Sequence, residues 1–547
     1  MKFSYRKGRE AYAKDAKASR FHCDHRVSFT TFAVAILLLL SAAATARAES
    51  VLRFVPHADL TIIDPHWTGA YITRNYGYMV YDTLFALDNA YKPQPQMVES
   101  WTASDDKLTW TFKLRGGLRW HDGQPVRAAD IVASLKRWGV RNDSYGQPLL
   151  AAASAIEATG DNEFRIALKT PFPVLEALGT MTSPSPFMLP ERLALTDPFT
   201  QIKEAVGSGP FKMAMADWRP GHQVVYSKNA DYVPRAEPPV WATGGKRVKL
   251  DRVEWNYIPD PVTAWQALAG GEVDYWENLA SDYVPMASRD PNVSISASLG
   301  LVGTLRFNQL YPPFDNIKMR QAVQAVVDQR DYMAAVAGDP SNWRTCPSVF
   351  ACDWETPDPP GGEALAGPRD YDKAKRLIAE AGYKGERILL LDAADIPQLH
   401  AEALVTNDVL KRLGLNVDLV TAEWGTVVRR VNTKEPPDKG GWHVFVTAFA
   451  VFDMINPATN RFLRANGTSA PAGWPTDAEL ESLRNEWFQA TDDAKRRDLA
   501  DRIQRRAFEF VTFIPTGQYR GRAAYRKALA GRPDAPIPFL WNIEKRQ

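Results

Sequence analysis

The sequence predicts an α/β protein, because helical stripes alternate with strands and several strands show a two-residue hydrophobic period. The alternation is clearest in residues 371–424, which contain two helix-then-strand units. In the first unit an apolar stripe at helical spacing ends at Gly382, and Arg387–Leu391 follows as a strand. In the second unit the stripe ends at Gly414, and Val417–Val420 follows as a strand. Helices that connect strands in this way cover the face of a sheet, so an α/β layer is expected.

The first 48 residues predict a secretory signal peptide. A start rich in Lys and Arg precedes the apolar run Phe29–Leu40, and small residues then lead to Ala46-Arg47-Ala48, an A-x-A cleavage site. The apolar run is too short to cross the roughly 30 Å hydrocarbon core of a bilayer, so it does not predict a membrane anchor. Glu49 is therefore the expected first residue of the mature chain.

Removing this leader reverses the sign of the net charge. The leader carries nine of the 66 Lys and Arg residues and three of the 64 Asp and Glu residues. The remaining 499 residues carry 57 basic and 61 acidic side chains, a net charge of −4 rather than +2. Nucleic-acid binding therefore has no support from charge, and the mature length suffices for two or three domains.

The N-terminal half of the mature chain predicts several strands and three helices. Strands are expected at Val51–Val55, Trp110–Leu114, Leu118–Trp120, Phe164–Leu168, Val224–Tyr226, Val253–Tyr257 and Thr304–Phe307. Helices are expected at Tyr71–Leu87, Ala128–Trp138 and Val262–Ala269. Gly207-Ser208-Gly209-Pro210-Phe211 interrupts this pattern strongly and predicts a domain border.

Two further helices and a strand are expected near the C-terminus. Thr476 and Glu479 have capping-box spacing and predict the start of a helix that carries Leu480, Leu483 and Trp487. A second helix ends at Phe510 and runs into the strand Val511–Pro515. The stretch Pro357–Pro368 is rich in Pro and Gly and predicts a surface loop.

The two mature cysteines, Cys346 and Cys352, predict a disulfide that closes a small loop. An even pair at short spacing favours this in an exported protein. The spacing does not match a redox C-x-x-C motif, and no neighbouring His or Cys cluster would complete a zinc site.

Five motifs in a fixed order carry a resemblance to a known family. The longest is Leu108–Asp130, LTWTFKLRGGLRWHDGQPVRAAD, a strand followed by an H-D-G turn and a helix. The other four are Gly207–Phe211, Leu268–Asp274, Arg306–Asn316 and Arg320–Val323. From about Val51 to Tyr519 the chain resembles the extracytoplasmic binding proteins for oligopeptides, dipeptides, nickel and related ligands, solute-binding protein family 5.

The resemblance implies two α/β lobes joined by a two-stranded hinge, with a third subdomain inserted in the first lobe. The implied division is a first lobe of 49–90, 207–300 and 511–547, an inserted subdomain of 91–206, and a second lobe of 301–510. The hinge strands would pass near Gly303–Asn308 and Phe510–Pro515. Ligand would bind between the lobes, which close over it.

The function that the resemblance implies is the periplasmic solute-binding component of an ABC importer. Such a protein, a monomer without a cofactor, captures a small polar solute and delivers it to a membrane permease driven by an ATPase. A short peptide or an amino-acid-derived compound is the expected ligand. The alternatives are a periplasmic chaperone or sensor partner on the same fold and a secreted hydrolase, although no nucleophile or metal constellation for catalysis is evident.

The resemblance also implies ligand-binding residues. Asp453 matches the family segment in which an Asp receives the ammonium group of a dipeptide; the alternative is a solvent-exposed turn Asp. The segment Leu391–His400, where the dipeptide binders carry an Arg that clamps the ligand carboxylate, contains no Arg here. Tyr71, Arg74 and Asn75 match the first-lobe loop over the ligand, and Arg74 could supply the missing anion contact. The alternative for Arg74 is a surface position at a helix start.

Three further residues are expected near the ligand. Arg306 begins a hinge segment, and Trp424 and Phe449 are candidates for aromatic walls. His121 and Asp122 belong to the H-D-G motif and predict a structural turn rather than a metal or acid–base site. No metal site is expected.

Overall fold

The computed structural model describes residues 49–352 and 361–546. The predicted signal peptide lies outside the described residues, as does part of the predicted loop Pro357–Pro368. The described part of that loop contains a short helix, α11 (Glu363–Ala366), which the loop prediction missed. No described helix is long and apolar enough to cross a membrane.

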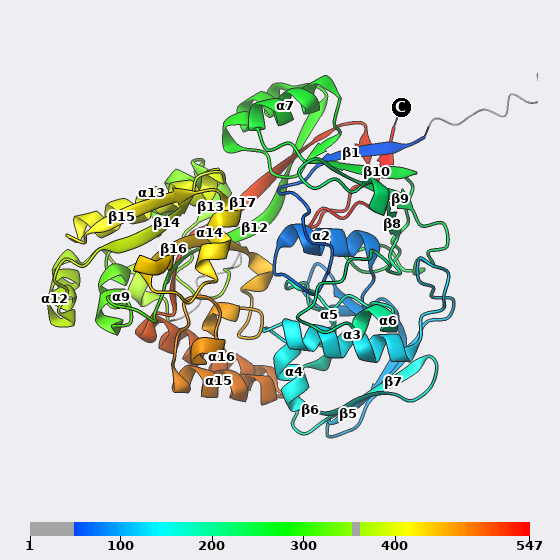
Figure 1. The fold of residues 1–547 in the computed structure, drawn as a ribbon, viewed down its shortest axis with the longest axis horizontal. Helices are drawn as coiled ribbons and strands as arrows, with labels where there is room; N and C mark the ends of the chain where they lie inside the picture. Colours follow the sequence, from blue (N-terminus) through cyan, green and yellow to red (C-terminus); the bar gives the residue numbers. More distant parts are fainter. Residues whose placement is uncertain (1–48, 353–360, 547) are drawn as a thin grey trace, which may run out of the picture. The chain divides into compact units, whose positions relative to one another are not determined.

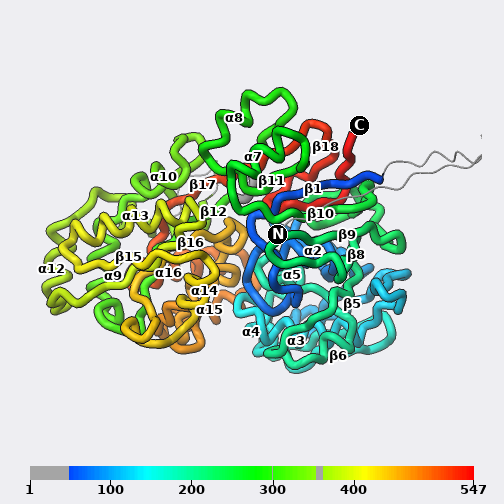
Figure 2. The backbone as a smooth tube through the Cα atoms, turned by 45° about the horizontal axis from the view of Figure 1, so that its top comes forward, coloured from blue at the N-terminus to red at the C-terminus, as the bar shows by residue number. Residues whose placement is uncertain are grey.

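An 11-stranded mixed sheet runs through the protein (Figures 1 and 2). Its strands lie in the order β15 (Val417–Ala422), β14 (Ile388–Ala393), β16 (Val444–Ala450), β12 (Val293–Phe307), β17 (Phe513–Arg526), β11 (Tyr275–Trp276), β1 (Val51–Val55), β10 (Arg252–Asn256), β9 (Gln223–Lys228) and β8 (Phe211–Met213). The eleventh, β13 (Trp343–Arg344), pairs with β17. Parallel pairs join β14 to β15 and β16, and β1 to β10 and β11; the other pairs are antiparallel.

Two long strands, β12 and β17, belong to both halves of this sheet. They pair antiparallel with each other along most of their length. Near one end β12 also pairs with β16, through Leu301–Phe307. Near the other end β17 pairs with β11, through Ala524 and Tyr525. Figure 1 shows the two strands side by side, with β14 and β16 on one side and β1 and β10 on the other. The two lobes are therefore joined by a two-stranded hinge, and its strands are longer than the short segments expected from sequence.

A second sheet of four antiparallel strands forms a separate layer beside the first lobe. Its order is β4 (Val98–Ala103), β5 (Thr109–Leu114), β7 (Glu163–Leu168) and β6 (Ala153–Ala158). The helices of this region are α3 (Ala128–Arg141), α4 (Gly146–Ala152), α5 (Val174–Gly179) and α6 (Glu191–Ala194). A two-stranded ribbon, β2 (Phe85–Leu87) with β3 (Pro93–Pro95), lies next to it in sequence. Alternation explains β5: Phe112 and Leu114 are buried in the core while Lys113 between them is exposed.

Helices cover the second half of the large sheet. They are α9 (Ile317–Gln324), α10 (Gln329–Ala337), α12 (Tyr371–Ala381), α13 (Pro397–Arg412), α14 (Trp424–Val431), α15 (Ala478–Gln489) and α16 (Asp493–Phe510). The two predicted helix-then-strand units appear as α12–β14 and α13–β15, and Gly382 ends α12 in a left-handed conformation. The first lobe contributes α2 (Tyr71–Val80), α7 (Pro261–Gly270) and α8 (Val284–Arg289).

The helix expected at Tyr71–Leu87 ends earlier, at Val80, and Phe85–Leu87 is a strand instead. A distant segment stops the helix: the carbonyl of Val80 accepts a 2.9 Å hydrogen bond from the Gly209 amide. A Cβ atom at Gly207 would lie 2.0 Å from the same carbonyl oxygen, so only glycine permits this approach.

Two other local predictions are wrong. Leu118–Trp120 forms no strand, because the chain turns back at once and the Trp120 amide donates to the Gln124 carbonyl at 2.8 Å. Helix α15 is capped by Asp477 rather than Thr476: its carboxylate accepts the Leu480 amide at 2.7 Å. The same carboxylate pairs with Arg506, which fixes the cap one residue later than the capping-box spacing indicates.

Candidate functional site

Helix α2 of the first lobe meets the end of strand β16 of the second lobe. Tyr71 is the first residue of α2, and Asp453 closes the 3₁₀ turn Val451–Asp453 that follows β16. The Tyr71 hydroxyl donates a 2.5 Å hydrogen bond to Asp453 Oδ2 and accepts one of 2.9 Å from the Ala450 amide. One phenol thus bonds both the site carboxylate and the backbone that positions it.

Arg74 lies three residues further along α2, on the same helix face as Tyr71. Its guanidinium carbon is 4.3 Å from the centre of the Tyr71 ring and 4.9 Å from that of Phe452. The residue is 2% exposed. Its Nη2 lies 3.4 Å from Asn75 Oδ1, while Nε and Nη1 have no hydrogen-bond partner among the described residues. The predicted cation is therefore buried rather than on the surface, with two unused donors.

Asp453 is also buried, at 7% exposed, so it is not a solvent-exposed turn residue. Its Oδ1 has no hydrogen-bond partner in the described part of the chain. Burial raises the pKa of Asp453 to about 6, although Arg74, Tyr71, Thr182 and Arg461 act in the opposite direction. The carboxylate is consequently ionised at neutral pH, and one of its two oxygens has no hydrogen bond from the described residues.

Arg306, on hinge strand β12, lies among three aromatic rings. Its guanidinium carbon is 4.9 Å from the Phe445 ring centre, 5.8 Å from Phe449 and 4.6 Å from Phe462. Arg306 is 6% exposed; its Nη1 donates a long 3.5 Å bond to the Ala472 carbonyl, and Nε has no partner among the described residues. The structure places Arg306 and Phe449, both predicted from sequence, in direct contact.

Arg461 connects the two groups of charges, and the sequence analysis did not identify it. Burial and then the charge of Arg461 lower the pKa of Arg306 to about 9. Arg461 also lowers the pKa of Asp453, so its charge acts on both residues. Its Nη2 pairs with Asp143 Oδ2 at 2.6 Å, in the region of the four-stranded sheet. No periodic or motif signal marks Arg461, because only the fold places it beside Asp453.

The two remaining predicted residues lie at the edge of this cluster. Trp424 is half-buried and stacks on Phe445, with ring centres 6.2 Å apart, behind the ring that contacts Arg306. Asn75 is on α2, but its amide donates to Glu277 Oε1 at 3.0 Å. The structure therefore engages the Asn75 side chain within the first lobe and not with Asp453.

The segment that lacks the expected arginine has a different role. It ends strand β14 and begins helix α13. Asp392 in this segment is fully buried, close to His400 Nδ1 at 2.8 Å, and accepts from Thr421 Oγ1 at 2.9 Å. The cations that act on Asp453 come instead from α2 (Arg74) and from the segment after β16 (Arg461).

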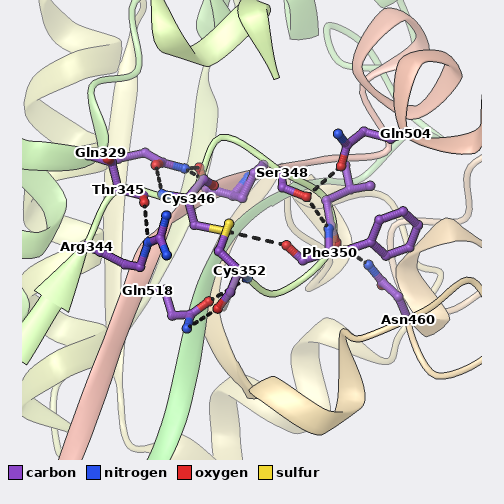
Figure 3. The surroundings of a disulfide bond; sticks show 12 residues. Gln329, Arg344, Thr345, Cys346, Ser348, Phe350, Cys352, Asn460, Gln504 and Gln518 are labelled. Atoms are coloured by element: carbon purple, nitrogen blue, oxygen red, sulfur yellow. Dashed lines mark hydrogen bonds between the residues drawn. A yellow bond between two sulfur atoms is a disulfide. The ribbon is translucent and has the colours of Figure 1, made fainter. Parts of the chain in front are cut away.

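The predicted disulfide between Cys346 and Cys352 is confirmed (Figure 3). Two glutamine amides hold its loop by paired hydrogen bonds to the cysteine backbones: Gln329 with Cys346 at 2.6 and 2.8 Å, and Gln518 of hinge strand β17 with Cys352 at 3.0 and 3.0 Å. The loop also contacts the segment that follows Asp453. The Ala351 amide donates to the Met454 carbonyl at 2.8 Å.

His121 makes a structural contact. Its Nδ1 accepts from the Gly207 amide at 3.3 Å and its Nε2 lies 3.1 Å from the Gly209 carbonyl. Burial lowers the pKa of His121 to about 4, so the ring is neutral. Among the described residues no cluster of three His, Cys, Asp or Glu side chains could hold a metal ion.

Comparison with known proteins places this arrangement in a family. Residues 92–469 match the family model "Bacterial extracellular solute-binding proteins, family 5 Middle". The chain is 37% identical to a probable peptide ABC transporter periplasmic-binding protein of Sinorhizobium fredii, over 94% of this chain and 97% of the relative. It is 26% identical to the heme-binding protein A of Haemophilus influenzae, over 82% of each chain.

Solved structures share the fold. The agropinic-acid complex of AgaA from Agrobacterium tumefaciens R10 superposes with a TM-score of 0.77 at 21% identity, covering 91% of this chain and 99% of that one. The oligopeptide-binding protein AppA of Bacillus subtilis, in complex with a nonapeptide, gives a TM-score of 0.76 at 19% identity, covering 91% and 100%. The two-lobe fold and the solute-binding role expected from sequence are confirmed, and the chain belongs to family 5 of the bacterial extracellular solute-binding proteins.

Proposed function

We propose that this protein captures a short peptide or amino-acid-derived compound between its lobes and delivers it to an ABC permease driven by an ATPase. The observation that carries the proposal is the meeting of Asp453 and Arg74 where the lobes join. Both charges are buried, and each has side-chain atoms without a partner among the described residues. The relative from Sinorhizobium fredii, named for peptide ABC transport, supports the same assignment.

The unused atoms define the groups that a solute must supply. Asp453 Oδ1 is an acceptor suited to an ammonium group, and Arg74 Nε and Nη1 are donors suited to a carboxylate. A buried charge with unmet hydrogen bonds raises the free energy of the protein. A ligand that supplies those hydrogen bonds therefore binds more tightly than the same contacts would allow at a solvent-exposed site. An amino-acid-like solute carries both groups on one small frame.

Access to the site requires the lobes to separate. Arg74, Asp453 and Arg306 are only 2–7% exposed, so a solute cannot reach them from outside in this conformation. Separation would break the Tyr71–Asp453 hydrogen bond and bend the hinge formed by β12 and β17. Re-closure around the solute would replace water at these charges and create the form that the permease recognises.

The remaining assignments belong to the same proposal. Cleavage after Ala48 would release a monomeric chain into the periplasm, where it binds its solute without a cofactor and without turnover. The lobe boundaries expected from sequence are part of the same proposal. The boundary between residues 300 and 301 falls inside β12, one of the two hinge strands.

Calorimetry with the mature chain, residues 49–547, tests the proposal. The protein is stripped of co-purified solute and titrated with dipeptides to pentapeptides, opines and glutathione. We expect at least one class to bind and to raise the melting temperature by mass action, about 2.7 kcal/mol of stabilisation at a hundredfold excess over Kd. Asp453→Asn should weaken that binding at least a hundredfold. The matched control is Asp392→Asn, another buried acid, which should leave Kd unchanged.

Two outcomes would count against parts of the proposal. If no solute binds to folded, stripped protein, the ligand class is wrong. If binding survives Asp453→Asn, solute capture stands but the ammonium contact is wrong.

A further inference from the structure

We infer that the solute is a net anion with one ammonium group and at least two acidic groups, one for Arg74 and one for Arg306. This inference rests on the proposed function, because it concerns the same site. It adds a second anion position, on the hinge strand, and a limit on the charge of the solute.

Comparison of two buried arginines shows why Arg306 needs a partner. Arg320, on α9, is 1% exposed and lies 4.8 Å from an aromatic ring centre. Its guanidinium donates to four backbone carbonyls at 2.8–3.2 Å, which occupy four of its five N–H groups. Arg306 is buried to a similar degree, yet its single protein hydrogen bond within the described chain is the 3.5 Å contact to Ala472. Arg320 is a structural arginine, whereas Arg306 has unused binding capacity.

The rings around Arg306 favour an anion in a defined orientation. Phe445, Phe449 and Phe462 surround the guanidinium group with apolar surface that accepts no conventional hydrogen bond. The N–H groups of a guanidinium lie in its plane, so a carboxylate binds at its edge, where two parallel hydrogen bonds can form. The unpaired Nε belongs to that edge.

The charges around the site do not balance without such a group. Arg461 is paired with Asp143, which offsets much of its charge, although its Nε has no hydrogen-bond partner among the described residues. Arg74 and Arg306 remain as two buried cations: the charge of Arg74 acts on the buried carboxylate of Asp453, whereas the charge that acts on Arg306 among the described residues is that of another cation, Arg461. A zwitterion with one carboxylate would satisfy Asp453 and one arginine, and would leave the other cation buried without an anion, which is strongly unfavourable. A solute with one ammonium and two carboxylates satisfies all three.

Matched dipeptides that differ by one charge test the inference. Calorimetry at pH 7.5 compares Ala-Glu with Ala-Gln and Glu-Ala with Gln-Ala, together with an N-(1-carboxyethyl) amino acid, which carries two carboxylates around one secondary amine. We expect at least one dicarboxylate to bind at least tenfold more tightly than its neutral counterpart. Arg306→Met should remove that preference, because it removes the cation that the second carboxylate meets.

A second measurement needs no ligand. Arg306→Met should leave the melting temperature of the ligand-free protein unchanged or raise it, because it removes a buried cation without partners. The matched control Arg320→Met should lower it by several degrees, because it leaves four carbonyls without a donor. Equal losses in the two variants would show that Arg306 is structural and would overturn the assignment.

The outcomes separate this inference from the proposed function. Equal or tighter binding of the neutral probes overturns the anionic solute and leaves solute capture intact. Failure of every probe, neutral or anionic, counts against both.

Discussion

The Tyr71 hydroxyl donates a 2.5 Å hydrogen bond to Asp453 Oδ2 and accepts one from the Ala450 amide, joining α2 of one lobe to the segment after β16 of the other. The bond ties the carboxylate to the opposite lobe. Closure and ligand binding are therefore linked through one side chain, because separation of α2 from the segment after β16 would break this bond.

Replacement of Tyr71 by Phe should weaken solute binding about ten- to a hundredfold. The ring and its contact with Arg74 remain, and the loss is one charge-assisted hydrogen bond, worth about 1.5–3 kcal/mol net. Small-angle scattering of the ligand-free variant should show a larger radius of gyration, since the closed form loses this link. Tyr332→Phe is the control: its buried hydroxyl lies 3.1 Å from Thr406 Oγ1 inside the second lobe, so Kd should not change. Equal effects of the two variants would contradict the assignment.

Binding of a solute through its ammonium group should weaken as the pH falls below about 6. Burial raises the pKa of Asp453 to about 6, so the free site gains a proton below that pH and must release it to receive the ammonium. Affinity should fall by up to tenfold per pH unit between pH 6 and 4.5, and should be flat from pH 6.5 to 8. Calorimetry across this range measures the slope, and Asp453→Asn should abolish it.

The same shift has the opposite sign for folding. A carboxyl whose folded pKa is raised contributes stability that is fully present below its unfolded pKa and is lost as the pH rises through about 6. Acidification through this window should thus favour the ligand-free fold through Asp453 while it weakens binding. If acidification lowered both the affinity and the stability contribution of Asp453, a group other than Asp453 would control the titration.

Local patterns predicted the strands and most helices of this fold because the signals are contained within each element. The alternation in β5 and the stripes of α12 and α13 follow directly from which face is buried. The end of α2 at Val80 could not be predicted in this way. What stops the helix is the backbone of Gly207–Gly209, which approaches only in the folded chain.

The site was predictable in part for the same reason. The family motif identified Asp453 and the start of α2, which the structure brings together. Arg461 has no such signal, and the sequence gives no basis for separating Arg306 from Arg320. Whether a buried arginine is solvated depends on carbonyls from other segments, such as Phe510 and Val511 for Arg320.

Removal of the disulfide should lower both stability and affinity. The cysteines are six positions apart, and closing so short a loop contributes about 2 kcal/mol in the chain-entropy description. The loop also supports the binding segment: the Asn460 side chain donates to the Val349 carbonyl at 2.7 Å, next to Arg461. We expect the double variant Cys346→Ser, Cys352→Ser to melt several degrees lower and to bind severalfold more weakly.

Reducing agent gives the matched control for that variant. It should lower the melting temperature and affinity of the wild-type protein to the values of the double variant, and should leave the variant unchanged. A lower melting temperature with unaltered Kd would show that the loop stabilises the lobe without positioning the site.

Glu402 on α13 should make the hinge region less stable as the pH rises. It is fully buried beneath β12 and β17: Thr516 Oγ1 donates to Oε2 at 3.4 Å, and a Cβ atom at Gly303 would lie 2.6 Å from Oε1. Oε1 has no hydrogen-bond partner among the described residues, and burial raises the pKa of Glu402 well above its usual value. The stability that the neutral acid contributes is present below its unfolded pKa and is lost as the pH rises through the raised value.

Glu402→Gln removes this titration and keeps the shape of the side chain. The variant should unfold at the same temperature as the wild-type protein near pH 5 and at a higher temperature near pH 8, a gain on the order of 1–3 kcal/mol for a buried group relieved of ionisation. Calorimetric melts at both pH values measure the difference. The control Thr516→Val removes the hydroxyl that bonds Glu402 and should lower stability at both pH values. Melting curves of Glu402→Gln that follow the wild-type pH dependence would mean that the acid does not titrate in this range, because its burial beneath the hinge strands keeps it neutral throughout.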